Sequence, residues 1–445
     1  MHRRTLLRTA AAGLLAGLAG CGEQTGTPTA TPRDGPAPPT PTPSEYGTVV
    51  DLVEEGADPK GERSIRPLLE EHTDDDTLLY LREGRFLLSG IWNVEDISKL
   101  ALVGDHATLV PAEGEETVQM NAVDSRDIAI EGLHFDYTDP DIDGRALQLK
   151  VSDGLLVSNV SVAGQIDRGN GPVRVDVTDP DGTGLVERVS IPDGSGEDRV
   201  TGMYVGDDNH GEIVFRDCHV EGFSDNGLYA DPPAGRIVVE GGYYANCGIS
   251  NVRVKSGSVV RGAHIRCDEP HPEFDNMRGI RATDYEPRPD AEPVVVEDCR
   301  VELLDVTHSD GAIVLSSKLA RLTIRNSRIR VNSDGVNAIR AKVPDATVAD
   351  GSTQPRLDCD NVTVTGSAAN DSAIRIDERH GCILDGLYVH QPGDDRDGIE
   401  FRRSTDNVVK NSVLDVAGEA VRLVNSTANV DASVSTNRTD TLSER

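Results

Sequence analysis

The sequence predicts an all-β fold, a right-handed parallel β-helix solenoid of about 10–12 coils with a short N-terminal capping helix. A short unit of alternating apolar residues recurs about every 28 residues, and no helical period of useful length interrupts the repeats. Strands at such a period suit coils that bury their inward side chains against the next coil. A β-propeller would need longer blades, of about 40–45 residues.

Each repeat consists of two short alternating runs joined by a turn residue, as in Ile213–Cys218 and Leu322–Ser327. Gly, Asn or Asp occupies the turn in all units but one, and these residues tolerate left-handed backbone angles. The predicted turn positions are Gly132, Asn159, Arg188, Asp217, Gly241, Gly262, Asp298, Asn326, Asn361, Gly386 and Asn411.

The N-terminal part contains a short strand at Val49–Leu52, an amphipathic stretch at Ser64–His72, and further apolar runs at Leu78–Leu81 and Leu100–Gly104. This order resembles the entry of right-handed β-helix proteins of the pectate lyase-like superfamily, and the resemblance covers about residues 46–425. It implies a capping helix, because an uncovered first coil would expose an unpaired sheet edge. It implies no single chemistry, since the superfamily includes lyases, hydrolases, epimerases and adhesins.

Superfamily signatures assign no catalytic residue. Asp207-Asp208 and Asp394-Asp395 are present, but the Gly-His-Gly and Arg-Ile-Lys signatures of polygalacturonases are absent from the sequence. The Arg-x-Pro-x-x-Arg signature of many pectate lyases is absent too.

The chain divides into four parts by composition. Residues 1–21 have paired arginines, a short apolar run and Leu18–Cys21, which resembles a twin-arginine signal with a lipobox, so lipidation is predicted at Cys21. Residues 22–44 form a Thr/Pro-rich stalk with too few apolar side chains to fold. The β-helix follows at 45–425 and a polar C-terminal tail at 426–445. We expect export and anchoring to the outer face of the cell membrane, or secretion as the alternative.

The charge is strongly acidic, with 76 Asp and Glu against 44 Lys and Arg and a formal net charge of −32. Most of the basic residues are Arg. In concentrated salt the Debye length falls to about 3 Å, so dense carboxylates can hydrate the surface without strong self-repulsion. The composition indicates a protein of the exported halophilic archaeal type; an acidic surface for a cationic partner is the alternative. The acidic charge argues against a nucleic-acid partner and against docking on anionic lipid. The predicted lipid anchor at Cys21 is then the one expected contact with the membrane.

One outward position recurs between two inward apolar residues in coil after coil. Because stacked coils lie about 4.8 Å apart, these residues should form a column on one face. The predicted column reads Tyr204, Tyr229, Arg253, Arg281, Val314, Arg340, Arg375, Glu400 and Arg422.

The column predicts binding of an acidic polysaccharide or surface glycan. Guanidinium groups match carboxylates or sulfates with paired hydrogen bonds, and the Tyr rings offer surfaces for a sugar. The alternative is a structural salt-bridge ladder, because acids recur just before the strands, at Asp225, Asp310, Asp371, Asp397 and Glu419. The predicted ligand-binding residues are Tyr204, Tyr229, Arg253, Arg281, Arg340 and Arg375.

Asp208, His210 and Asp225 are catalytic candidates near the aromatic end of the column. Paired carboxylates could serve glycoside hydrolysis, or bind Ca²⁺ that acidifies a uronate proton in a lyase. The alternative is an ordinary turn in an acid-rich protein. No metal site is predicted, because the His residues show no zinc-ligand spacing.

The sequence therefore predicts a cell-surface β-helix protein that binds, and in one version processes, an acidic polysaccharide. Two alternatives stay open: a polysaccharide lyase or glycoside hydrolase, and a non-catalytic surface or adhesion module.

Overall fold

The structure is a computed structural model, and it describes residues 41–114, 117–167, 171–196, 199–274 and 276–436. The predicted signal, the lipidation site at Cys21 and most of the predicted stalk lie outside these residues. Within the described part, no helix is both long enough and apolar enough to cross a membrane.

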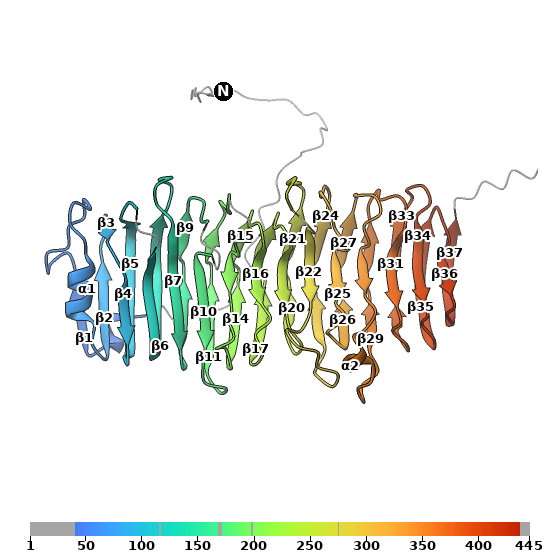
Figure 1. Cartoon of the computed structure of the whole chain (residues 1–445), viewed down its shortest axis with the longest axis horizontal. Coiled ribbons are helices and arrows are strands. Elements are labelled where there is room, and N and C mark those ends of the chain that lie inside the picture. The colour runs from blue at the N-terminus through green and yellow to red at the C-terminus, as the bar shows by residue number, and fades with distance from the viewer. Residues whose placement is uncertain (1–40, 115–116, 168–170, 197–198, 275, 437–445) are drawn as a thin grey trace, which may run out of the picture. The chain divides into compact units, whose positions relative to one another are not determined.

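The body is a right-handed parallel β-helix of about 14 turns, whose coils stack along its long axis (Figure 1). Each strand pairs in parallel with the equivalent strand one coil away, as in the series β16–β19–β22. The fold class is confirmed. The number of coils exceeds the predicted 10–12, because further coils precede Gly132, the first of the predicted turn positions.

Strands of successive coils form three faces, which we name after their outward side chains. The arginine face comprises β4 (Trp92–Glu95), β7 (Gly144–Val151), β10 (Val173–Val177), β13 (Met203–Tyr204), β16 (Asn226–Ala230), β19 (Ser250–Val254), β22 (Arg278–Ala282), β25 (Ile313–Leu315), β28 (Ile339–Ala341), β31 (Ser372–Asp377), β34 (Asp397–Arg402) and β36 (Val421–Val424).

The ladder face carries outward charges that alternate in sign from coil to coil between Glu187 and Asp360. It comprises β1 (Thr48–Asp51), β2 (Thr77–Leu81), β8 (Leu155–Ser158), β11 (Thr183–Glu187), β14 (Glu212–Arg216), β17 (Arg236–Glu240), β20 (Val259–Arg261), β23 (Val294–Glu297), β26 (Arg321–Arg325), β29 (Arg356–Asp360) and β32 (Ile383–Asp385).

The histidine face completes each coil. It comprises β3 (Gly84–Leu88), β9 (Ser161–Ala163), β12 (Ser190–Ile191), β15 (His219–Glu221), β18 (Tyr243–Ala245), β21 (His264–Cys267), β24 (Arg300–Leu303), β27 (Arg328–Val331), β30 (Thr363–Thr365) and β33 (Tyr388–Gln391). Four long strands run over more than one face: β5 (Ser98–Pro111), β6 (Thr117–Asp136), β35 (Asn407–Val416) and β37 (Ala428–Thr436).

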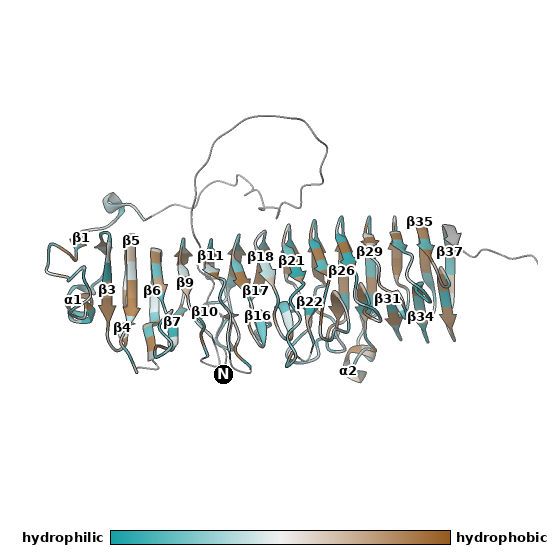
Figure 2. Cartoon of the chain, turned by 90° about the horizontal axis from the view of Figure 1, so that it is seen from above, coloured by the Kyte–Doolittle hydropathy of each residue, from teal (hydrophilic) through white to brown (hydrophobic). Residues whose placement is uncertain are grey.

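The core is one continuous column of apolar side chains inside the coils, running from Leu52 to Ala420. Hydrophobic and hydrophilic residues alternate along the strands (Figure 2), as the period of two in a strand requires. Burial of each Val, Ile or Leu contributes roughly 1.5–3 kcal/mol. Because every coil buries its inward side chains in the same column, the outward side chains are free to set the chemistry of the faces.

The two ends of the solenoid are closed differently. At the N-terminal end, α1 (Arg66–His72) buries Leu69 completely against the core, which confirms the predicted cap. A 3₁₀-helix, η1 (Pro43–Glu45), precedes the first strand. At the other end β37 pairs with β35, so residues 428–436 belong to the β-helix. The boundary predicted at residue 425 is therefore too early, because the backbone of residues 428–436 continues the parallel pairing of the solenoid.

The turns confirm the sequence pattern closely. All eleven predicted turn positions have positive φ angles, between 47° and 69°. Arg188 adopts this conformation although its side chain disfavours it, and a short ion pair of 2.5 Å to the buried Glu187 accompanies it.

The six cysteines of the described residues are buried and free. Cys218 and Cys299 follow turn residues and lie in the core, as predicted, and burial raises the pKa of each thiol to about 12. They therefore act as small apolar core residues.

Candidate functional site

The predicted column exists on the arginine face in the predicted order. Strand pairing places Tyr204 against Tyr229, Tyr229 against Arg253, and Arg253 against Arg281. The register then continues through Val314, Arg340, Arg375, Glu400 and Arg422.

The column begins earlier than the sequence analysis placed it. Arg174 of β10 pairs with Tyr204, and Gln148 of β7 pairs with Arg174. Asp176, two residues after Arg174, is fully buried and accepts a hydrogen bond from the Arg174 Nε at 2.8 Å. Burial raises the pKa of Asp176 in spite of this contact. The strand Val173–Val177 shows the same alternation as the later strands, so this signal could have been found from the sequence.

The two tyrosines do not form a flat platform. Their rings meet edge to face at 5.4 Å between centroids. The guanidinium of Arg253 lies 4.1 Å from the centroid of the Tyr229 ring, and that of Arg174 lies 5.4 Å from the Tyr204 centroid. A sugar can therefore use the uncovered ring faces and edges, while the arginines hold both rings in place.

Arg253 is fixed by a buried carboxylate. Its Nε and Nη2 atoms lie 2.8 Å and 2.6 Å from the Asp231 Oδ2 atom. The other Asp231 oxygen, Oδ1, is buried without a hydrogen-bond partner in the described part of the chain. Burial outweighs the attraction of Arg253 and raises the pKa of Asp231 to about 6. Asp231 directly follows β16, and the sequence pattern did not assign it to the column.

Arg281 differs from the arginines beside it. Its side chain is half-buried, and it makes no hydrogen bond or ion pair within the described residues. Burial, followed by the charges of Arg253 and Arg278, lowers the pKa of Arg281 to about 10. Carboxylates near Arg281 pair with other cations. The Asp310 carboxylate lies 2.5 Å from the Nε atom of Arg278 and also forms an ion pair with Lys342. Arg281 therefore presents five hydrogen-bond donors without a protein acceptor.

The C-terminal half of the column is charge-compensated. Arg340 pairs with the buried Asp377, and Arg375 lies 3.4 Å from the same carboxylate. Arg422 lies 3.1 Å from Asp397. Glu400, itself in the column, is buried and lies 3.8 Å from Arg375. For this half the predicted salt-bridge ladder describes the geometry. Arg340 is paired, whereas Arg375 lies 3.4–3.8 Å from three carboxylates and its buried Nε has no hydrogen-bond partner in the described residues.

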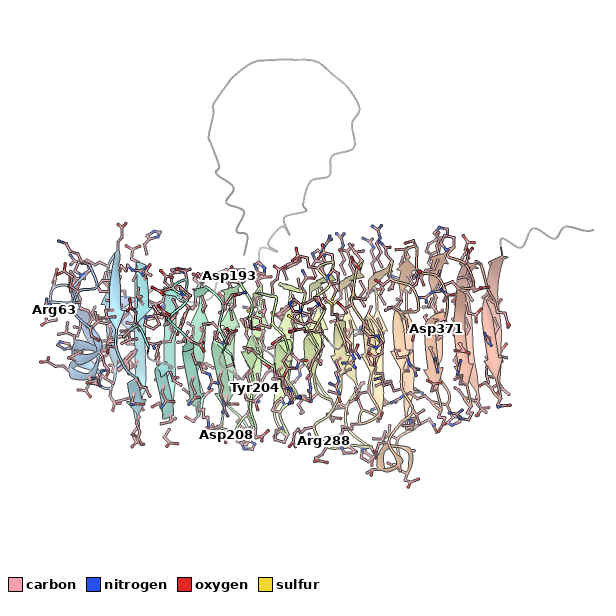
Figure 3. The ribbon with its side chains drawn as sticks, turned by 45° about the horizontal axis from the view of Figure 1, so that its top comes forward. Arg63, Asp193, Tyr204, Asp208, Arg288 and Asp371 are labelled. Carbon is pink, nitrogen blue, oxygen red and sulfur yellow. The ribbon has the colours of Figure 1, made fainter. Side chains whose placement is uncertain are left out.

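The three catalytic candidates fall into two groups. Asp208 follows β13 and lies at the edge of the body, while Tyr204 lies on the face (Figure 3). Its carboxylate accepts from Lys150 at 2.6 Å and from Arg174 at 3.0 Å, and the Lys150 contact lowers the pKa of Asp208. His210 is exposed and adds a smaller electrostatic effect on Asp208.

Asp225 precedes β16 and therefore lies at the opposite end of its strand from the position of Asp208. It is half-buried and accepts a hydrogen bond from the Asn226 side chain. Burial raises the pKa of Asp225, and the nearest opposing charges are those of Arg253 and Arg281. The structure thus associates Asp225 with the arginines, and Asp208 and His210 with the preceding coils.

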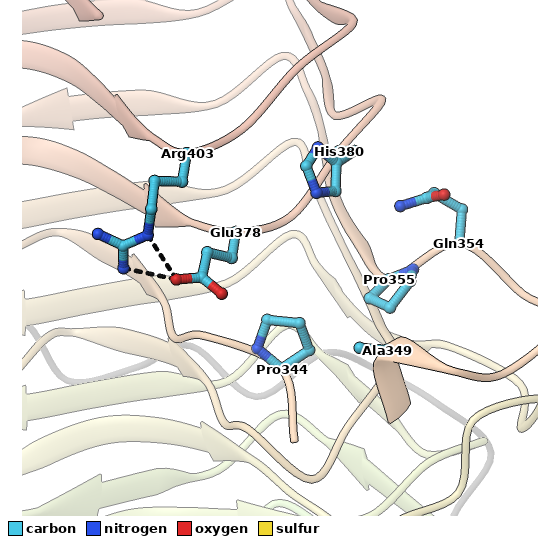
Figure 4. Close-up of a pocket in the computed structure, with 7 residues that line it drawn as sticks. All are labelled: Pro344, Ala349, Gln354, Pro355, Glu378, His380 and Arg403. Atoms are coloured by element: carbon cyan, nitrogen blue, oxygen red, sulfur yellow. Dashed lines mark hydrogen bonds and ion pairs between the residues drawn. The ribbon is translucent and has the colours of Figure 1, made fainter. Parts of the chain in front are cut away.

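Two further features of the surface complete the description. No group of three or more His, Cys, Asp or Glu side chains in the described ranges is arranged to hold a metal ion. A cavity of about 350 Å³ lies beside α2 (Ala346–Ala349) and is lined by Glu378, His380 and Arg403 among others (Figure 4). Arg403 donates to Glu378 at 2.5 Å, so these two charges satisfy each other.

Comparisons with known proteins give remote similarities. No protein-family model matches the chain, and no curated protein matches it. A surface adhesin of Streptococcus pneumoniae, PfbA, is 10% identical with a TM-score of 0.46, over 87% of this chain and 93% of that chain. A family 28 exopolygalacturonase of Yersinia enterocolitica is 10% identical with a TM-score of 0.48, over 86% and 78%. The A-module of the mannuronan C-5 epimerase AlgE6 of Azotobacter vinelandii is 14% identical with a TM-score of 0.40, over 86% and 97%. Similarities of this size assign no activity to the chain.

Proposed function

We propose that the arginine face binds an acidic polysaccharide along the segment Tyr204–Arg281. One observation carries the proposal: the Arg281 guanidinium is half-buried, lies next to Arg253 and has no acceptor in the described residues. A buried cation without a partner is costly, and a ligand carboxylate or sulfate would supply the missing acceptors.

A linear polymer fits this site better than a small anion. Coils lie about 4.8 Å apart, so residues of one column present a regular series of contacts along a line. The half-buried rings of Tyr204 and Tyr229 stand next to the arginines, which allows sugar contacts beside charge contacts. Arg340, which we predicted as a ligand residue, is excluded from the proposed site because the Asp377 carboxylate already occupies it. Arg375, also predicted, lies outside the proposed segment, and three carboxylates surround it at 3.4–3.8 Å.

The test is calorimetric titration with hexagalacturonate, comparing the wild type with Arg281→Gln and with the matched control Arg340→Gln. A hydrogen bond to a charged group contributes about 1.5–3 kcal/mol, so Arg281→Gln should weaken binding about tenfold or more. Arg340→Gln changes the net charge equally and should alter affinity less than twofold. Equal losses in both variants would mean that the ligand senses net charge alone, which would contradict the proposal.

A second candidate function is cleavage or modification of the polymer. The observation in its favour is Asp231, a buried carboxyl with a pKa of about 6 beside Arg253 and Tyr229. A group of this kind can exchange a proton near neutral pH. Product formation from polygalacturonate is measured by assays for new reducing ends and for unsaturated products. It should disappear in Asp231→Asn while binding of the polymer persists. Binding without any product would instead favour the adhesion module.

We further propose that the protein is exported by the twin-arginine route and anchored through Cys21 in a halophilic archaeal cell. The paired Arg3 and Arg4, the run before Cys21 and the acidic composition support this. Replacing Cys21 with Ser should release the protein into the medium, and retention in the membrane fraction would contradict the anchor.

A further inference from the structure

The histidine face carries a second column that changes from rings to arginines. Strand pairing aligns His219 with Tyr243, Tyr243 with His264, His264 with Arg300, and Arg300 with Arg328. The three rings meet nearly edge to face, with 5.2 Å between successive centroids. The order of rings followed by guanidinium groups is the same as on the arginine face, and the two columns belong to the same coils.

A single buried carboxylate pairs with the cationic side chains at the point where the rings of this column give way to arginines. Glu302 accepts from His264 at 2.9 Å and from Arg300 at 2.9 Å, and Arg266 lies 3.6 Å away. Burial opposes ionisation, but the hydrogen bonds of His264 and Arg300 prevail and lower the pKa of Glu302 to about 2. Glu302 is therefore ionised and fully engaged with these neighbours.

The next two arginines have no such partner. Arg328 and Arg330 are exposed, and neither side chain makes a hydrogen bond or ion pair within the ranges that the structure describes. Together with Arg300 and Glu302 they line a cavity of about 240 Å³. The segment thus holds an excess of positive charge on a chain whose net charge is −32.

We propose that Arg328 and Arg330, beside the paired Arg300, form a second anion-binding surface, which takes the carboxylate or sulfate groups of a linear acidic polysaccharide. Arg328 and Arg330 both face outward on β27, about 6.6 Å apart along the strand, so their guanidinium groups can hold neighbouring acidic groups of one chain. The ring edges of Tyr243 and His264 extend the same line and offer contacts for neutral parts of the sugar. The surface lies on a different face from Arg281, so the protein would bind two polymer segments.

The experiment titrates the full chain with hexagalacturonate and, separately, with a sulfated maltohexaose, using neutral maltohexaose as the uncharged control. The variants are Arg328→Gln/Arg330→Gln, Arg281→Gln, and the matched control Arg261→Gln/Arg325→Gln, whose exposed arginines are ion-paired on the ladder face. The wild type should bind two equivalents of at least one charged hexamer. Arg328→Gln/Arg330→Gln should remove one equivalent, and the ladder-face control should remove none.

The outcomes separate this surface from the site on the arginine face. A stoichiometry that stays the same in Arg328→Gln/Arg330→Gln would overturn the second surface while leaving the arginine-face site intact. Loss of one equivalent in Arg328→Gln/Arg330→Gln, with Arg281→Gln unchanged, would support the second surface and overturn the first. Equal losses in the ladder-face control would also overturn the second surface, because net charge would then explain binding. The charged hexamer that binds, whether hexagalacturonate or the sulfated maltohexaose, identifies the chemical class of the ligand.

Discussion

The ladder face and the arginine face use the same strand spacing with opposite results. On the ladder face Glu187, Arg216, Glu240, Arg261, Glu297 and Arg325 follow one another in register, so each charge has an opposite charge on the next coil. On the arginine face Arg253 and Arg281 are direct neighbours. An alternating column neutralises itself, whereas a column of like charges needs carboxylates from elsewhere or a ligand.

The comparison also divides the arginine face itself. In its C-terminal half Asp377, Asp397 and Glu400 supply the missing carboxylates, and the column becomes a ladder of a different kind. Near Arg281 the carboxylates of Asp231 and Asp310 are committed to other cations, and Asp225 interacts with Arg281 through its charge without forming an ion pair in the described residues. The type of residue in a column therefore does not define a binding site; the surplus of charge after pairing does.

The largest effect on stability should come from removing the carboxylate that compensates the positive charges on the strands around Arg281. Asp310→Asn takes the partner from Arg278 and Lys342. Burial opposes ionisation of Asp310, but these two cations lower its pKa from 3.8 to about 2, so the ionised form stabilises the fold above about pH 4. The variant should lose about 2 kcal/mol of unfolding free energy at neutral pH, measured by denaturant unfolding. The loss should shrink as the pH falls from about 4 toward 2, and a loss that does not change over this range would contradict the assignment.

A smaller effect should follow from interrupting the alternation on the ladder face. Glu240→Gln leaves Arg216 and Arg261 without the carboxylate that they share. Because these side chains are partly exposed, the expected cost is about 1 kcal/mol, and added salt should reduce it. Measurement of unfolding at two salt concentrations tests this. A cost that is independent of salt would point to packing instead of charge.

A change of pH should alter the ligand affinity of the arginine face, by a smaller free energy than the two substitutions above. Burial raises the pKa of Asp231 to about 6, so below that pH its carboxyl is neutral and no longer offsets Arg253. Affinity for hexagalacturonate, whose own carboxylates stay ionised at pH 5, should therefore increase about threefold between pH 8 and pH 5. Asp231→Asn should bind with little pH dependence over the same range. If the variant keeps the full dependence, another group is responsible.

The smallest effect is expected from a paired arginine. Arg325 lies 2.8 Å from Glu297 on the ladder face, so Arg325→Gln should leave the affinity for hexagalacturonate within about twofold of the wild type. A loss comparable to that of Arg281→Gln would remove the distinction between the two faces.

The sequence predicted the turns and the column because both depend on local residue types. Gly, Asn and Asp mark left-handed turns, and an outward residue between two inward apolar ones marks its place in the column. The register from Tyr204 to Arg422 followed without knowledge of the loops, since each coil must align its apolar residues with those of the next.

The ion pairs could not be predicted in the same way. As one alternative, the acids before the strands were offered as counter-ions of the column, and Asp397 and Asp371 do pair with Arg422 and Arg375. Arg253, however, uses Asp231, which follows its strand, and Arg340 uses Asp377 of the next coil. Which carboxylate reaches which arginine depends on loop lengths and side-chain directions that no local pattern encodes. Among the described residues Arg281 has no partner, and this is a property of the whole neighbourhood, so only the structure reveals it.

The most direct test of the central claim is a crystal structure of the protein with bound hexagalacturonate. We predict that a ligand carboxylate lies within hydrogen-bond distance of the Arg281 guanidinium, with a sugar ring beside Tyr229 and no ligand on the ladder face. A hexamer bound along Arg216, Arg261 and Arg325, with Arg281 left uncontacted, would contradict the account.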